Sequence, residues 1–495
     1  MKEIVSDIKS FFADKTALKI IFAGLIVRLI VSAIVPLGFD EAYYSLYADN
    51  PAWGFFDHPP VVALTAGFGV YLTGIYSALT LRLGAIILFL LSSVILYAIT
   101  LRLFKEKAAR LSLIIFHIIP YFIFGMGAFV IPDNALGFFW LLLLYCLVLI
   151  QQTEKSKYII LAGISTGFAL LSKYHGILLI GGIGILLIFF KQWRELWKNP
   201  FLYVALWFTV LIFLPNILWN YEHNWLSYAY QFGKSSDGLN LSLTKFLQGV
   251  FVQMGYLLPW NMILILLSIY FVIKQKKKES YFLIPFVVIP VVIFTLIGAT
   301  RQILPHWPMP GYLAGIVLLA GVMPEWKTKK LKWFLVPSVV LTSIAAIVIL
   351  LQVTTRVLPL AKNADITLDG QGWEQVADEL KKDNLITEDT FLFTYKWFTS
   401  GQLSFALENK YPVLVLNKKF PHGFSTWYDY KSFTGKEGIF VCTERFNENP
   451  VELFAGYFSS FELIKTVNAK RNDKTAQVFY VWKCGKLIKD FETSY

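Results

Sequence analysis

The feature that most constrains this chain is a series of apolar runs, each about twenty residues long. A helix needs about twenty apolar residues to cross the hydrocarbon core of a bilayer. Eleven such runs lie near residues 17–38, 78–101, 110–131, 133–150, 158–173, 176–190, 200–219, 248–273, 281–299, 307–324 and 333–353. We therefore expect an α-helical polytopic membrane protein with about eleven transmembrane helices. The polar break at 173–176 leaves open whether the fifth and sixth runs form one bent segment.

The composition agrees with a membrane protein. Hydrophobic residues make up 56% of the 495 residues and charged residues 16%, whereas roughly a quarter of an ordinary soluble chain is charged. The formal net charge of +12 would suit a nucleic-acid partner if the basic residues shared one face or tail. They come instead in short runs between the apolar stretches. These runs indicate cytoplasmic loops, and we expect no nucleic-acid partner.

The basic residues also predict the orientation in the membrane. They gather in alternate loops, at residues 2–15, 102–110, 155–157, 191–198, 274–278 and 327–332. The intervening loops hold only Lys173, Lys234, Lys245 and Arg301. Because basic loops stay in the cytoplasm, we expect a cytoplasmic N-terminus and an extracytoplasmic C-terminus. The first run is long enough to span and has no small-residue cleavage site after it, so we expect it to remain as the first span.

The last part of the chain reads as a separate soluble domain. From about residue 356 the sequence becomes charged and rich in turn residues, with a helix-like stretch at 373–382. Short alternating apolar runs lie at 390–395, 413–416, 438–442 and 478–482. We expect residues 1–355 to form the transmembrane domain, with a large first outer loop at 38–77, and residues 356–495 to form an extracytoplasmic α/β domain. Cys442 and Cys484 are the cysteines that could pair there, and the sequence leaves this open.

Ionisable residues gather at the outer ends of the predicted spans. The first outer loop has no Lys or Arg between residues 38 and 76 and carries Asp40, Glu41, Asp49, Asp57 and His58. The other outer ends carry Asp133, Lys173, His175, Glu222, His223, Arg301 and His306. Ionisable groups in or near a bilayer are costly and mark functional sites. Their position predicts a site at the membrane surface. The apolar stretch at 61–76 is too short to span, and we expect it to lie along that surface.

Two interpretations of these residues stay open at this point. Asp40 and Glu41 either anchor a short span, or supply a general base whose neighbour binds substrate or tunes its pKa. The second open question concerns Lys173, His175 and Arg301. These side chains either reach toward lipid headgroups or join His58, which precedes two prolines, as convergent donors that would bind a phosphate.

Absent motifs exclude several classes of protein. The sequence has no Walker-type phosphate loop, no Cys-x-x-Cys pair and no His-Glu-x-x-His motif. Two alternatives to an enzyme remain: a multi-pass transporter, which should show repeats and polar groups near the midplane, or a membrane sensor or scaffold with an extracytoplasmic ligand domain.

Six short segments carry a resemblance to a known family. They are Phe39 to Tyr44, Asp57 to Pro60, Ile131 to Leu136, Leu171 to His175, Glu222 to Trp225 and Gly370 to Trp373. In this order and on this side of the membrane they resemble polytopic glycosyltransferases that take a sugar from a polyprenyl phosphate. That group includes bacterial family 39 enzymes, protein O-mannosyltransferases and lipid A aminoarabinose transferases. The resemblance covers most of the chain and implies a GT-C-like fold in a bacterial cytoplasmic membrane.

The resemblance also implies roles for single residues. Asp40 matches the catalytic aspartate of the first outer loop, Glu41 lies beside it, and Asp133 belongs to the rim of the active site. By the same match Lys173 lies near the donor phosphate. From the residues themselves we also expect Tyr43, His58, His175 and Arg301 to bind substrate. The aminoarabinose transferases have a lysine where this chain has His58, so phosphate binding there would depend on protonation of the imidazole.

A metal site and an activity complete what the resemblance implies. Asp57 and His223 match a metal-site pattern, but two protein ligands are few for a structural site, and no other cofactor is expected. The implied reaction is inverting transfer of a sugar from the lipid donor to an acceptor lipid, glycan or protein, in the manner of lipid A modification, outside the cytoplasmic membrane.

Overall fold

The computed structural model describes residues 2–233, 241–419, 422–446 and 448–491. Lys234, which contributed to the predicted orientation, lies outside the described residues. The chain folds into two compact units. The first comprises Met1–Ile30, His58–Thr65 and Gly84–Ile344, and the second comprises Val31–Asp57, Ala66–Leu83 and Ala345–Tyr495.

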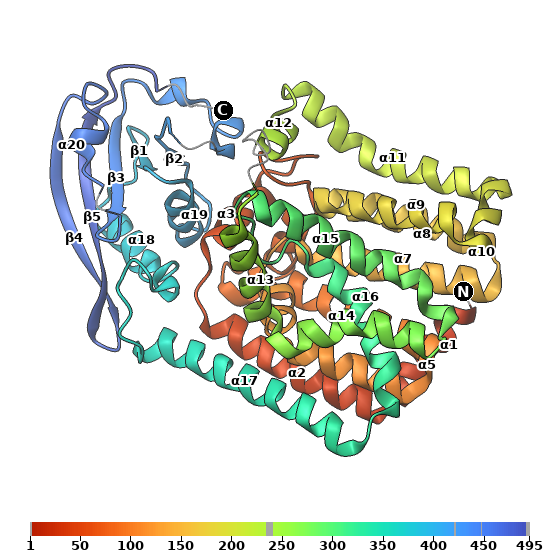
Figure 1. The fold of residues 1–495 in the computed structure, drawn as a ribbon. Helices are drawn as coiled ribbons and strands as arrows, with labels where there is room; N and C mark the ends of the chain where they lie inside the picture. Colours follow the sequence, from red (N-terminus) through yellow and green to blue (C-terminus); the bar gives the residue numbers. More distant parts are fainter. Residues whose placement is uncertain (1, 234–240, 420–421, 447, 492–495) are drawn as a thin grey trace. The chain divides into compact units, whose positions relative to one another are not determined.

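The first unit is a bundle of helices (Figure 1). The helices that lie in it wholly or partly are α1 Lys2–Ala13, α2 Lys15–Ile34, α4 Val61–Thr73, α5 Ala78–Ile118, α6 Met126–Ala128, α7 Asp133–Thr153, α8 Ser156–Ser172, α9 Ile177–Phe189, α10 Lys191–Arg194, α11 Pro200–Glu222, α12 Leu226–Gly233, α13 Leu243–Leu257, α14 Pro259–Lys274, α15 Ile284–Thr300, α16 Met309–Val322 and α17 Thr328–Thr355. Among the described residues, six helices are long and apolar enough to cross a membrane, or up to eight if each bent pair is one span. The predicted polytopic helical architecture is confirmed, while the count of eleven stays a prediction.

Three breaks in the helices correspond to features of the sequence. Helix α5 is interrupted at Lys105, whose φ of 72° and ψ of 177° are not helical, inside the predicted basic loop. A 3₁₀ turn at Tyr174–Gly176 separates α8 from α9, so the fifth and sixth runs form two helices. The predicted span at 248–273 is not straight, because the chain bends by 99° between α13 and α14. Pro259 begins α14, and a proline disfavours helical backbone in the residue before it, here Leu258.

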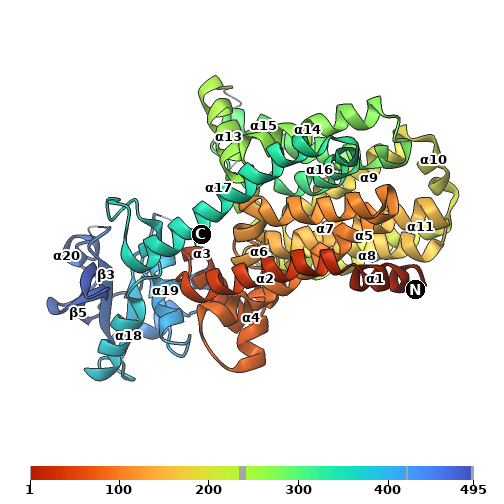
Figure 2. The ribbon, with the colours of Figure 1, turned by 90° about the horizontal axis from the view of Figure 1, so that it is seen from below.

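Small residues allow the helices of this unit to approach closely. A Cβ atom on Gly163 of α8 would lie 2.2 Å from the carbonyl oxygen of Ala205 in α11. Helices in membranes associate through such close approaches, because the lipid offers no hydrophobic driving force between them. Helices α7, α8 and α11 accordingly lie side by side (Figure 2).

The second unit contains the predicted α/β domain. Its helices are α3 Phe39–Asp49, α18 Trp373–Lys382, α19 Trp397–Ala406 and α20 Pro450–Leu453, and its strands are β1 Thr390–Thr394, β2 Val413–Val415, β3 Glu437–Thr443, β4 Phe461–Arg471 and β5 Lys474–Lys486. The strand order is β2-β1-β3-β5-β4, with β1 parallel to β2 and β3 and the other pairs antiparallel. The predicted helix at 373–382 and the four predicted strands are confirmed. Strand β4 was not predicted, because its charged residues, which an edge strand tolerates, obscure the alternation.

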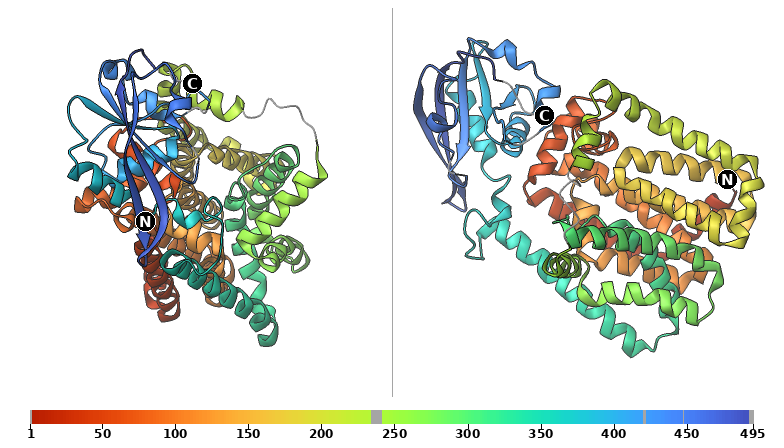
Figure 3. Two further views of the ribbon diagram at one scale, coloured as in Figure 1. Left: turned by 90° about the vertical axis from the view of Figure 1, so that its left-hand side faces the viewer. Right: turned by 45° about the horizontal axis from the view of Figure 1, so that its top comes forward.

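The sheet buries both faces. Leu392 of β1 points to a core formed with α18 and α19, which contribute Trp373, Val376 and Leu403. Its neighbours Phe391 and Phe393 point to the other face, as the two-residue period of a strand requires. Figure 3 shows the sheet and its covering elements in two further views. All three cysteines, each among the described residues, are free. Cys442 of β3 lies opposite Tyr480, and Cys484 of β5 lies opposite Gly438, so the pair left open by the sequence does not form.

Candidate active site

The start of α3 holds the acidic pair of the first outer loop. The backbone N–H of Gly38 donates to Glu41 Oε2 at 3.0 Å, which satisfies one of the free N–H groups at the helix start. Asp40 and Glu41 lie in the first turn of α3, where the positive end of the helix dipole stabilises carboxylates. The sequence thus fixes both carboxylates at the beginning of a helix, with their side chains in different surroundings.

Glu41 is held by an arginine that the sequence analysis missed. Arg82 Nε and Nη2 lie 2.8 and 2.5 Å from the two oxygens of Glu41, and both side chains are buried. Arg82 also donates to the carbonyl oxygens of Ser32, Val35 and Pro36. This arrangement favours a positioning role for Glu41 over the predicted catalytic one. The sequence did contain a signal for this arginine, because a charged residue near the start of the apolar run at 78–101 is costly unless it has a partner.

Unlike the buried Glu41, Asp40 is exposed to solvent. Nearby protein atoms nevertheless desolvate its carboxylate. This desolvation, together with the negative charges of Asp57, Glu41 and Asp369, raises the pKa of Asp40 to about 6. A carboxylate with that pKa is ionised at neutral pH and is a better proton acceptor than an ordinary aspartate.

The tyrosines of α3 are packing residues. Tyr43 is 3% exposed, its hydroxyl accepts the N–H of Gly423 at 2.9 Å, and its ring contacts Trp397, Phe424 and Trp427. The burial of Tyr43 therefore indicates packing rather than the predicted substrate-binding role. One turn further on, the Tyr47 hydroxyl donates to Asp57.

A second group of ionisable residues lies in the first unit. Asp133, at the start of α7, is 2% exposed, and its Oδ2 lies 2.6 Å from Nζ of Lys173, which is 4% exposed. The alternative in which Lys173 reaches out to lipid headgroups is thus wrong. The hydroxyl of Tyr121 lies close to the Asp133 carboxylate and interacts with it, although Tyr121 and Asp133 Oδ1 do not meet ordinary hydrogen-bond geometry.

Three histidines and an arginine complete the predicted residues of this unit. His306 Nε2 lies 3.9 Å from Asp133 Oδ2, and burial followed by the charge of Lys173 lowers the pKa of His306 to about 4. His58 is within electrostatic range of Asp133 and His306. His175 packs on Phe294 and Trp307. Arg301 follows the last residue of α15.

The structure brings these residues together in two groups. Asp40, Glu41 and Asp57 belong to the second unit, and Asp133, Lys173, His58, His175 and His306 belong to the first. The sequence marks His306 as an ionisable residue at an outer end and assigns it no role. Its position three residues before α16 gave no sign of its approach to Asp133.

The suggested metal ligands are engaged with other groups. Asp57 accepts the hydroxyl of Tyr47. His223 caps α11, with Nδ1 2.8 Å from the carbonyl oxygen of Trp219 and its ring stacked on that indole. Across the part of the chain that the structure describes, no three His, Cys, Asp or Glu side chains are grouped as a metal site requires. These residues do not fit a metal, and we derive no step through one.

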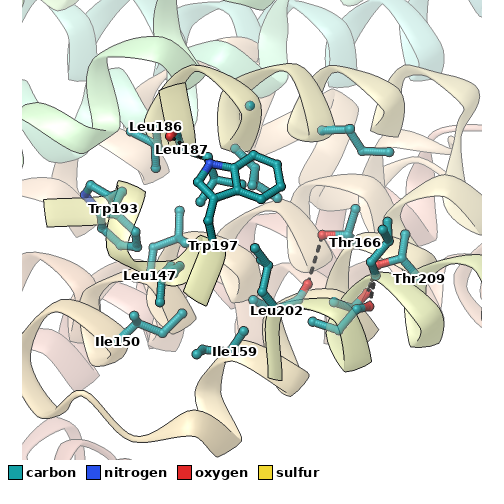
Figure 4. A pocket seen from close by; sticks show the side chains of 18 of the residues that line it. Leu147, Ile150, Ile159, Thr166, Leu186, Leu187, Trp193, Trp197, Leu202 and Thr209 are labelled. Atoms are coloured by element: carbon teal, nitrogen blue, oxygen red, sulfur yellow. Dashed lines mark hydrogen bonds between the residues drawn. The ribbon is translucent and has the colours of Figure 1, made fainter. Parts of the chain in front are cut away.

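An apolar cavity of about 350 Å³ lies elsewhere in the first unit, among α7, α8, α9, α10 and α11. Figure 4 shows its walls, which include Trp193, Trp197 and Leu202. The hydroxyls of Thr166 and Thr209 donate to backbone carbonyls of their own or a neighbouring helix. Among the described residues that line the cavity, none carries a carboxylate, an imidazole or an ammonium group, so its walls offer no such acid or base to a reaction.

Comparisons with known proteins agree with this architecture. The family model described as dolichyl-phosphate-mannose-protein mannosyltransferase matches residues 57–219. The lipid A galacturonosyltransferase RgtD of Rhizobium johnstonii is 21% identical over 287 residues, which cover 57% of this chain and 60% of that protein. The match therefore spans less than two thirds of the length of this relative.

Two solved structures resemble nearly the whole chain. ArnT from Cupriavidus metallidurans in the apo state has a TM-score of 0.64 at 14% identity, and the match covers 94% of this chain and 97% of that one. The same protein bound to undecaprenyl phosphate has a TM-score of 0.65 at 13% identity, with the same coverage. This likeness shows that the chain has the fold of the GT-C membrane proteins.

The predicted resemblance is therefore confirmed. The family model, the relative and these solved structures are all of GT-C glycosyltransferases. This chain is therefore similar in fold to GT-C membrane proteins, and over residues 57–219 it matches the mannosyltransferase family model. The comparisons favour this class over the transporter and the sensor or scaffold.

Proposed function

We propose that the protein is an integral membrane glycosyltransferase that moves a sugar from a polyprenyl phosphate to an acceptor lipid, glycan or protein. The observation that carries the proposal is the state of Asp40. It is an exposed carboxylate at the start of α3 with a pKa near 6, which suits a general base at neutral pH.

In the proposed reaction an acceptor hydroxyl attacks the anomeric carbon of the donor sugar. The new glycosidic C–O bond forms as the bond between that carbon and the phosphate oxygen breaks, and the hydroxyl proton passes to Asp40. Polyprenyl phosphate leaves with its bonding electrons, and a single displacement inverts the anomeric centre. Glu41 holds the helix start through Arg82 and does not itself react.

The donor phosphate needs positive charge more than it needs a proton. Lys173 supplies a buried ammonium group next to Asp133. His58 and Arg301 are the remaining candidates for phosphate contacts. The ArnT structure bound to undecaprenyl phosphate and the relative that acts on lipid A support a lipid-linked donor and an envelope lipid as acceptor.

The location that fits this chemistry is the bacterial cytoplasmic membrane, with the N-terminus inside and the C-terminal domain outside. Single cysteines at Lys276 and Asp429 test it in intact cells with a reagent that does not cross membranes. Labelling of the Asp429 position and protection of the Lys276 position are expected. Labelling of both positions would overturn the orientation.

The activity itself is tested with the purified full-length chain in lipid nanodiscs. A panel of undecaprenyl phosphate sugars is offered together with bacterial envelope lipids, and release of undecaprenyl phosphate is measured alongside sugar transfer. Release that requires both donor and acceptor supports the proposal. Binding of every donor without any release, across the full acceptor panel, would favour the sensor alternative.

A further inference from the structure

The segment that leads into Asp40 is held from two sides. Arg82 donates to the carbonyl oxygens of Val35 and Pro36 at 2.6 and 3.0 Å. The next carbonyl oxygen, of Leu37, accepts a hydrogen bond of 2.9 Å from Nε2 of Gln402, a buried residue of α19 in the C-terminal part of the chain. The backbone just before Asp40 therefore has little freedom to move.

A turn of the C-terminal part packs on the same backbone. A Cβ atom on Gly370 would lie 2.5 Å from the carbonyl oxygen of Leu37 and 2.9 Å from Cβ of Pro36. No side chain fits between them, which gives a physical reason for the glycine in the motif Gly370 to Trp373. On α19, a Cβ atom on Gly401 would lie 3.1 Å from the backbone nitrogen of Tyr43, so α3 and α19 also meet at backbone distance.

Aromatic contacts fix the residue next to Asp40. The ring of Phe39 lies 4.3 Å from that of Phe398 and 6.4 Å from that of Phe446, measured between centroids. Phe446 follows Arg445, whose guanidinium lies 5.5 Å from the Phe446 ring. The same short stretch thus contacts the residue before Asp40 and carries a buried cation.

That cation belongs to an ion pair beside the Gly370 turn. Arg445 Nη1 lies 3.0 Å from Asp369 Oδ1, and the two side chains are 4% and 17% exposed. Arg445 Nε donates to the carbonyl oxygen of Lys362 at 2.9 Å, which restrains the guanidinium. Asp369 is in turn one of the charges that act on Asp40.

We infer that the C-terminal domain is part of the catalytic apparatus: Gln402 and the Asp369–Gly370 turn position the backbone before Asp40, and the Asp369–Arg445 pair places a balanced charge beside its carboxylate. This inference rests on the proposed role of Asp40 as general base. Asp369, Arg445 and Gln402 are positioning residues, because none of them is assigned a contact with substrate.

The other two carboxylates that act on Asp40 also have hydrogen-bonding partners. Glu41 is paired with Arg82, and Asp57 accepts the hydroxyl of the neutral Tyr47. Asp369 differs because its partner Arg445 comes from a loop after β3, and the guanidinium donates to Lys362, Asp365 and Asp369. The two members of this pair should therefore act on Asp40 with opposite signs.

The experiment compares pH profiles of kcat/KM for Asp369→Asn and Arg445→Met in the full-length protein. Removing the negative charge of Asp369 favours the ionised form of Asp40, so the acid limb should move to lower pH by about half a unit or more. Removing Arg445 leaves Asp369 uncompensated and should move the limb to higher pH by a similar amount, while Arg445→Lys should restore the parent midpoint. Asp383→Asn, in an ion pair with Lys465 in the same domain, should leave the midpoint unchanged.

The possible results are separable. Opposite shifts support the inference, and lower rates at every pH with an unmoved midpoint in both variants would overturn it, because a purely structural pair produces that result. Asp40→Asn is measured in parallel. If that variant transfers sugar at the parent rate, the proposed function of Asp40 fails; if it is inactive and the midpoints do not move, the inference alone fails.

Discussion

Arg82 and Glu41 form a bidentate ion pair, with Nε and Nη2 of the arginine 2.8 and 2.5 Å from the two carboxylate oxygens. The pair joins α5 to α3 across 41 residues of sequence. The remaining hydrogen bonds of the Arg82 guanidinium go to backbone carbonyls near the end of α2. One buried side chain therefore ties three helices together next to Asp40.

Removing this arginine should destabilise the protein strongly. Arg82→Met leaves the Glu41 carboxylate buried and unpaired, and we expect the free energy of unfolding to fall by about 3–5 kcal/mol. Glu41→Gln keeps an acceptor for Arg82 and should lose less. Thermal unfolding in detergent measures both. Lys198→Met is the matched control, because its partner Glu195 and Lys198 itself are largely exposed, and no measurable change is expected there. Equal melting temperatures for Arg82→Met and Lys198→Met would contradict the clamp.

Asp40→Asn should strongly reduce turnover and spare the fold. The amide nearly preserves shape but cannot accept the acceptor proton, so a loss of roughly a hundredfold or more in kcat is expected, with donor affinity unchanged. Donor binding and sugar transfer are measured separately. Asp49→Asn, on the last turn of the same helix, is the control and should keep turnover within a few fold. A near-parent rate for Asp40→Asn would make Asp133 the next residue to examine.

The raised pKa of Asp40 gives a pH prediction with a definite sign. The proposed reaction needs the carboxylate, so kcat/KM should fall about tenfold per pH unit below a midpoint near pH 6. The sign for stability is the reverse. The pKa is higher in the folded protein than the ordinary 3.8, so Asp40 favours folding at acid pH and loses this contribution as pH rises through 6. Asp40→Asn should therefore melt at a higher temperature than the parent at pH 8 but not at pH 4. A lower melting temperature for the variant at pH 8 would contradict this electrostatic account.

Lys173 should contribute to stability as well as to donor use. Lys173→Met leaves the Asp133 carboxylate buried without its partner, which should reduce the free energy of unfolding by about 3–5 kcal/mol. Adding Asp133→Asn removes the stranded charge and should recover most of that stability. Donor binding should stay weak in the double variant, because the ammonium group is still missing. Calorimetry and a donor-binding titration separate the two effects. Parent-like donor affinity in the stable double variant would limit Lys173 to a structural part.

Local patterns of sequence predicted the elements of this fold. Long apolar runs identified the helices of the bundle, and short apolar runs at 390–395 and 438–442, set among charged and turn residues, identified strands whose side chains pack on both faces of the sheet. These features depend on neighbouring residues, and periodicity therefore reveals them. The 99° bend between α13 and α14 depends on how helices pack, and its only local sign was the proline that follows Leu258.

The candidate site was predictable to a smaller extent. Asp40 and Lys173 were found from their position at the ends of apolar runs, which reflects the cost of charge near a bilayer. The hydrogen-bonding partners around these two residues come from distant segments of the chain. Arg82 pairs with Glu41 beside Asp40, Asp133 pairs with Lys173, and Gln402 donates to the carbonyl oxygen of Leu37. Nothing in the residues around Gln402 indicates such a hydrogen bond. Tyr43 was assigned to substrate for its motif, and its burial became visible only in the folded chain.

The hydrogen bond from Gln402 to Leu37 joins residues 365 positions apart, and this separation has a consequence for biosynthesis. A ribosome adding roughly 5–20 residues per second makes Gln402 about 20–70 seconds after Leu37. During that interval the segment before Asp40 has left the ribosome without the partner that holds it. A nascent or truncated chain that ends before α19 therefore lacks this hydrogen bond to the segment before Asp40.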